Sequence, residues 1–136
     1  MTSQLNVDTI VDKAGSGGTN VKVANTSTYV SDGGAVTQNT VRGIAKSWAA
    51  RLSTTDASIN DSLNVSSTAD SGTGRTTVTF TNDFSSINFS VVMGVESNYP
   101  YKGYPASAST MFLNTLNSAN SHADGMGALT AHGDLA

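Results

Sequence analysis

The chain has 136 residues, with seven Lys and Arg against ten Asp and Glu, a hydrophobic share of 38%, and no cysteine. Its net charge is −3 and its cations are scattered singly, so the sequence gives little electrostatic support for binding nucleic acid. The lack of cysteine excludes disulfides, thiolate metal sites and thiol nucleophiles. A chain of this length suits one globular unit with an appendage.

Neutral polar residues dominate the composition. The charged share of 12% is about half the ordinary one, whereas Ser, Thr and Asn together make up 49 residues. Threonine tolerates strands, while Ser, Asn and Gly form turns and compete with helices for backbone hydrogen bonds. The composition therefore predicts a β protein.

The first residues, 1–6, lack the basic start and apolar core of a signal peptide, and no apolar run is long enough to cross a bilayer. We therefore expect no membrane insertion. We also expect the chain to stay in the cytosol unless a larger assembly carries it out.

Residues 1–38 are predicted to form an attachment segment or tether. Apolar residues are followed by a glycine-rich stretch, 15–18, and by two short alternating pieces at 21–24 and 27–30; the apolar residues are Leu5, Val7, Ile10 and Val11. These pieces are too small to bury a core, so they are expected to pair with another copy or another protein. A frayed N-terminus is the alternative.

The segment 39–52 begins the predicted domain, 39–136, and fits both a helix and a strand. One helical face would carry Val41, Ile44, Ala45, Trp48 and Leu52. One side of a strand would carry Ile44, Trp48, Ala50 and Leu52. In either case Trp48, the single tryptophan, is predicted to be a buried anchor.

Strands are predicted throughout 60–136. A tight turn with Gly72 and Gly74 leads into a half-buried strand, in which Val78 and Phe80 face one side and threonines face the other. The run 89–95 continues the alternation, so 75–95 is predicted to be a hairpin. A loop over 96–109 is followed by two more short strands, and the last of these runs almost to the C-terminus. The expected fold is an antiparallel sandwich.

Residues that could carry out chemistry are sparse, so no catalytic residue, metal site or cofactor is predicted. Ser121, His122 and Asp124 are too close in sequence to supply triad geometry by adjacency, and no nucleophile-elbow motif accompanies them. A lone histidine is more often a simple polar residue than a metal ligand. The glycine-rich stretch 15–18 lacks the Lys-Ser/Thr of a phosphate-binding loop, and the few carboxylates are not paired as in a glycosidase.

The stretch NYPYKGYPAS is the candidate binding loop, with Tyr99, Tyr101, Lys102 and Tyr104 as its site residues. Prolines stiffen such a loop, and tyrosines offer flat amphipathic faces that suit sugar stacking or a protein contact. Rings that close the end of the sandwich or pack between subunits are the alternative. The loop is therefore expected to be an interface first and a receptor site second.

Residues 44–95 resemble the C-terminal β-domain of tail-fibre and related virion proteins of tailed bacteriophages. In those proteins a Lys-Ala-Trp stretch precedes a pattern of the type I-x-x-S-x-N-V-S-S-x-x-D-x-G-T-G-x-x-T-V-x-F. This chain has Lys46, Ser47 and Trp48, then Ile59, Ser62, Asn64, Val65, Ser66, Ser67, Asp70, Gly72, Thr73, Gly74, Thr77, Val78 and Phe80. The opening LNVDTIVDKAG is similar to N-terminal segments of fibres from phages of aquatic bacteria. The chain is much shorter than a full fibre and has no long shaft.

The resemblance implies a non-enzymatic part of the virion exterior, assembled in the host cytoplasm. Its partners would be two sister copies in a homotrimer, another virion protein at the N-terminus, and a host surface glycan or protein. The resemblance favours a strand over 46–48 and a small, jelly-roll-like sandwich. Two functions stay open: a short fibre or spike that touches the host, and a decoration protein that cements the capsid.

Overall fold

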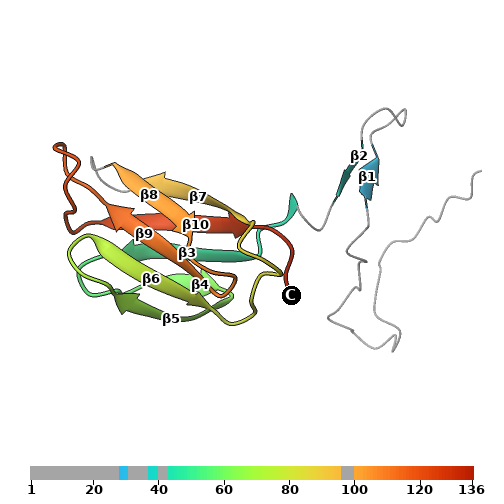
Figure 1. Cartoon of the computed structure of the whole chain (residues 1–136), viewed down its shortest axis with the longest axis horizontal. Coiled ribbons are helices and arrows are strands. Elements are labelled where there is room, and N and C mark those ends of the chain that lie inside the picture. The colour runs from blue at the N-terminus through green and yellow to red at the C-terminus, as the bar shows by residue number, and fades with distance from the viewer. Residues whose placement is uncertain (1–27, 31–36, 40–42, 96–99) are drawn as a thin grey trace, which may run out of the picture.

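A computed structural model describes residues 28–30, 37–39, 43–95 and 100–136 (Figure 1). The attachment residues Leu5, Val7, Ile10 and Val11 lie outside the described residues, as does Tyr99. Among the described residues, no helix is long and apolar enough to cross a membrane. The strands are β1 (Thr28–Val30), β2 (Thr37–Asn39), β3 (Ser47–Ser53), β4 (Asp61–Leu63), β5 (Val65–Asp70), β6 (Arg75–Phe80), β7 (Ser90–Val95), β8 (Tyr101–Pro105), β9 (Thr110–Thr115) and β10 (Met126–His132).

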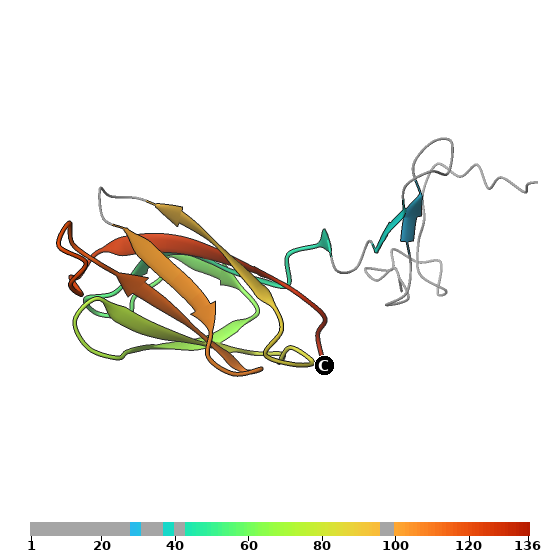
Figure 2. The same ribbon diagram turned by 45° about the horizontal axis from the view of Figure 1, so that its top comes forward.

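Two antiparallel four-stranded sheets form the head, with strand orders β4-β3-β10-β7 and β5-β6-β9-β8. Figures 1 and 2 show these sheets stacked as two layers, with the C-terminus at the end where β3 begins. The short strands β1 and β2 pair with each other. The prediction of an all-β antiparallel fold is confirmed, whereas the strand order of one chain does not show jelly-roll-like connectivity or a trimer.

The tight turn predicted at Gly72 and Gly74 is present, since β5 pairs with β6 across it and both glycines have positive φ. The hairpin predicted over 75–95 is wrong. Strand β6 pairs with β5 and β9, while β7 pairs with β10 in the other sheet. The segment between β6 and β7 is therefore a crossover between the layers. Alternation fixes which face a strand buries but not which strand it pairs with.

The core lies between the two sheets and follows the predicted alternation. Val78 and Phe80 are buried, and Val91 and Met93 pack against the buried residues from the other sheet. The buried cluster is Ala49, Leu52, Val78, Phe80, Phe84, Phe89, Met111, Leu113, Leu129 and Ala131. Burying such apolar surface is the main favourable contribution to the stability of a fold of this size.

Asn64 turns the chain from one sheet into the other, between β4 and β5. Its φ is 56°, in the left-handed region that Asn tolerates better than most residues. The Asn64 side chain ties this corner to the crossover, because its Oδ1 accepts from the Asn82 amide at 2.7 Å and its Nδ2 donates to the Asn82 carbonyl at 3.0 Å. The corner therefore joins the two layers at one side of the sandwich.

The segment 47–53 is a strand, as the phage-fibre resemblance favoured, while 41–42 lie outside the described residues. Trp48 is only half-buried, so its prediction as a buried anchor is wrong. It lies on the outer face of its sheet because its neighbour Ala49 points into the core. In the strand register Trp48 lies between Leu63 and Thr130, and Thr130 lies opposite Val92. Leu63 and Val92 are exposed, which makes this outer face partly apolar.

Candidate functional site

The predicted binding loop is a strand. Residues 101–105 form β8 at the edge of its sheet, paired with β9 alone, so the prediction of a loop over 96–109 is wrong for this part. The prolines favoured a loop because they lack an amide donor, but Pro105 ends an edge strand, where that donor is not needed. The strand period then sends successive side chains to opposite faces of the sheet.

Tyr101 therefore points into the sandwich. Its ring packs against the hydrophobic core and its hydroxyl donates to the Met126 carbonyl in the other sheet. A Cβ on Gly127 would lie 3.2 Å from the Tyr101 ring, which shows how closely the ring contacts β10. This arrangement agrees with the alternative in which the rings close the sandwich. A binding role for Tyr101 thus has little geometric support.

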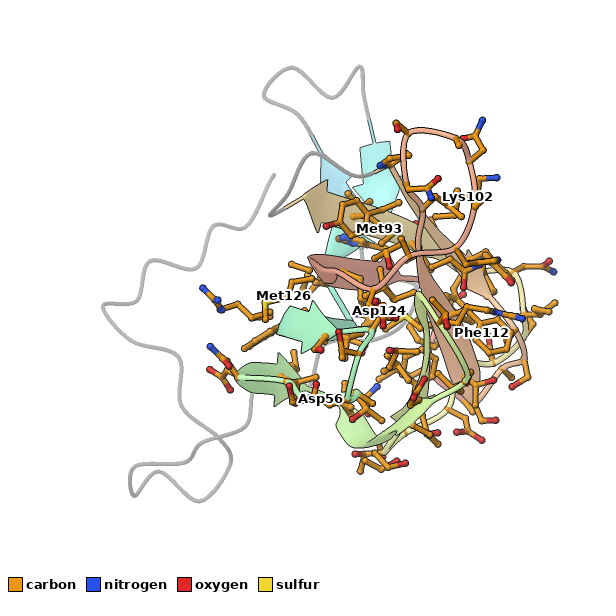
Figure 3. All side chains as sticks on the ribbon, turned by 90° about the vertical axis from the view of Figure 1, so that its left-hand side faces the viewer. Asp56, Met93, Lys102, Phe112, Asp124 and Met126 are labelled. Atoms are coloured by element: carbon orange, nitrogen blue, oxygen red, sulfur yellow. The ribbon has the colours of Figure 1, made fainter. Side chains whose placement is uncertain are left out.

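Lys102 and Tyr104 instead lie on the outer face of the sheet β5-β6-β9-β8. Across the strand register Lys102 is opposite Asn114, and Asn114 is opposite Arg75. In the next row of the same face, Tyr104 is opposite Phe112. Figure 3 shows Lys102 and Phe112 on one side of the head, away from Met126. We call these five residues, Arg75, Lys102, Tyr104, Phe112 and Asn114, the β8–β9–β6 face.

Phe112 is the centre of this face. The Arg75 guanidinium lies 5.5 Å from the centroid of the Phe112 ring, within the range of a cation–π interaction. The Tyr104 ring contacts Phe112 edge to face, with centroids 5.4 Å apart and an interplanar angle of 64°. Phe112 therefore contacts both a cation and a second aromatic ring, and Tyr104 keeps 38% of its surface exposed.

Hydrogen-bonding capacity on this face is incompletely used. Asn114 is only 6% exposed, its Oδ1 has no hydrogen-bond partner, and its Nδ2 lies 3.5 Å from the Tyr104 hydroxyl. The Arg75 Nε is also buried without a partner. Buried polar atoms are nearly always paired in folded proteins, so two such atoms in neighbouring residues mark an unusual place. Within the described residues, no carboxylate forms an ion pair with Arg75 or Lys102.

Two parts of this face were not predicted. Arg75 and Phe112 are far apart in sequence and meet only because β6 pairs with β9. The sequence signal that could have found this face is the alternation of buried and polar residues along the two strands. Thr77 and Phe112 both lie on the polar side of strands whose other side is buried. An aromatic residue on the polar side of a strand indicates a candidate binding surface.

A pocket of about 490 Å³ opens at the end of the β7–β10 ladder. The ladder ends at the pair His132 and Ser90, and the two segments meet again beyond the pocket, where the Ser85 amide donates to the Asp134 carbonyl at 2.8 Å. Its polar lining is Ser85, Ser86, Asn88, Ser90, His132 and Asp134. Its hydroxyl, amide, imidazole and carboxylate groups suit a small polar molecule.

Two of the three residues that could be imagined as a catalytic triad, His122 and Asp124, make other contacts. The Asp124 carboxylate accepts from the Gly74 amide at 2.6 Å, and His122 forms an isolated bridge with Leu116. Asp124 thus fixes the turn between β5 and β6. Within the described ranges, no group of three or more His, Asp or Glu residues could hold a metal ion.

Comparison of the chain with family models, with curated proteins and with solved structures gives no match.

Proposed function

We propose that this chain is a non-enzymatic exterior protein of a bacteriophage virion, a short fibre or spike whose N-terminal segment attaches it to the particle. The β head would present the β8–β9–β6 face to the host surface. This face is the observation on which the proposal mainly rests, because it combines an exposed ring with two cations on a rigid sheet. Sites built on strands hold their side chains more exactly than sites on loops.

A homotrimer of such heads also fits the other sheet. The row Leu63, Trp48 and Val92 leaves apolar surface on the outer face of β4-β3-β10-β7. Contact with sister copies would remove that surface from water, which favours association. The two outer faces would then have different tasks, self-association on the apolar one and ligand binding on the cationic one.

A capsid decoration protein is the second candidate. The same apolar row would suit a head that lies against a protein shell, with residues 1–38 joining a neighbouring subunit's sheet by strand addition. In that case the particle would carry many more copies than a fibre requires.

Removal of residues 1–18 should leave a folded head that no longer joins the particle. The sandwich strands all come from residue 47 onward, so the unfolding midpoint in urea should stay unchanged. The measurement is incorporation into particles assembled with the shortened chain, beside its urea midpoint. A full-length variant with serine at Leu5, Val7, Ile10 and Val11 is the matched control, because it removes the apolar side chains and keeps the length. Normal incorporation would overturn the attachment role, and loss of folding would place the segment in the core.

A further inference from the structure

The β8–β9–β6 face has the chemistry of a site for an anion with an apolar side. Arg75 on β6 and Lys102 on β8 supply two positive charges on the two strands that flank β9, with Asn114 of β9 between them in one row. The whole chain has a net charge of −3, so this concentration of cations does not follow from the composition. No carboxylate of the described residues neutralises either cation.

Arg75 is held ready for a ligand. Its guanidinium carbon lies 5.5 Å from the centroid of the Phe112 ring, and this cation–π contact restricts the positions that the side chain takes. A planar guanidinium recognises a carboxylate through two parallel hydrogen bonds, and orienting it in advance lowers the entropy cost of binding. Phe112 is thus a positioning residue for Arg75.

Tyr104 supplies the apolar part of the site. Its ring is partly exposed beside Phe112 and offers a face that carries partial negative charge. The weakly positive C–H groups of a sugar ring suit such a face. Asn114 lies between the two cations in the register, and its Nδ2 is 3.5 Å from the Tyr104 hydroxyl.

We propose that the β8–β9–β6 face binds a saccharide that carries a carboxylate, with Arg75 and Lys102 on the carboxylate and Tyr104 against the sugar ring. The inference rests on the proposed function of this face and names its ligand class. A nucleic acid fits less well, because two cations neutralise too few phosphates for useful affinity. The flat surface of the sheet also suits a sugar ring better than it suits a peptide side chain, which would need a pocket in which to be buried.

The experiment titrates the full chain with a short oligogalacturonate and follows binding by isothermal calorimetry and by backbone amide shifts. The control ligand is the same oligosaccharide with its carboxylates methyl-esterified. We expect shifts centred on β6, β8 and β9 with the acid, and a loss of affinity with the ester. Arg75→Gln should weaken binding about tenfold, as expected when a charge-assisted hydrogen bond is lost. Lys102→Gln, which alters an exposed residue, should weaken it less.

Two matched variants locate the site. Arg51→Gln removes an exposed cation from the other sheet, and Asn88→Ala alters the pocket at the end of the β7–β10 ladder. Both should leave the affinity unchanged. Equal binding of the methyl ester, equal weakening by Arg51→Gln, or shifts confined to the pocket would each overturn the inference. Equal binding of a short poly-glutamate peptide would show that the ligand class is an acidic peptide and not a saccharide. No binding of the acid at all would reject the ligand class. The proposed function is tested separately, by incorporation of the chain into particles.

Discussion

Gly74→Ala should destabilise the head by about 2–5 kcal/mol, the sum expected for a left-handed residue that gains a Cβ and for overpacking against fixed neighbours. Gly74 is buried at φ +65°, and its new Cβ would lie 2.6 Å from the Thr115 carbonyl oxygen and 2.7 Å from the Ala123 amide nitrogen. Both are backbone atoms, which cannot move aside as a flexible side chain can. The Asp124 bond to the Gly74 amide would also be disturbed.

Gly72→Ala is the matched control in the same turn. Gly72 has φ +109° but nothing within 4 Å of an added Cβ, so only backbone strain of about 1–2 kcal/mol is expected. Urea unfolding followed by Trp48 fluorescence measures both variants. If Gly74→Ala does not fold, Asp124→Asn is the milder variant, because it removes only the charge of the group that accepts from the Gly74 amide. Equal costs for the two glycine variants would contradict the close approach of the turn to 115–124.

Phe84→Ala should cost about 3–5 kcal/mol, the range for truncating a buried aromatic side chain. Phe84 is 2% exposed, stacks on Phe89 with centroids 4.2 Å apart, and meets Phe80 edge to face at 4.9 Å. It belongs to the crossover between β6 and β7 and forms a bridge with Leu135 near the C-terminus. Its loss should therefore loosen the chain end as well as the core.

Ile87→Ala is the control for this change, because Ile87 lies in the same crossover and is 51% exposed. An exposed truncation of this kind should change the free energy of unfolding by about 0.5 kcal/mol or less. Hydrogen exchange adds a local reading, since the Ala136 amide bonds the Asp83 carbonyl at 2.9 Å and should exchange faster in Phe84→Ala alone. A cost for Phe84→Ala as small as that for Ile87→Ala would contradict its place in the core.

Local patterns in the sequence predicted the strands better than their partners. The alternation of threonine with Val78 and Phe80 correctly gave a half-buried strand, and the glycine spacing gave its turn. Pairing across the sheets is non-local, so the partner of β6 could not be read from adjacent residues. Phe84 was not predicted as a core residue, because it stands outside any alternating run and is buried by the crossover between layers.

The candidate site was predicted only in part. Lys102 and Tyr104 were named from the tyrosine-rich stretch, and the structure joins them to Arg75, Phe112 and Asn114. The sequence predicts a loop there, in which the direction of each side chain is open, and this prediction places Tyr101 with them. A strand decides that direction, and it sends Tyr101 to the opposite face.

A count of this chain in purified particles, by quantitative mass spectrometry, tests the proposed function most directly. A fibre or spike built from symmetric oligomers predicts a stoichiometry on the order of tens of copies per particle. Copies on the order of hundreds would assign the chain to the capsid shell as a decoration protein. Absence of the chain from particles that infect normally would contradict its place on the virion exterior.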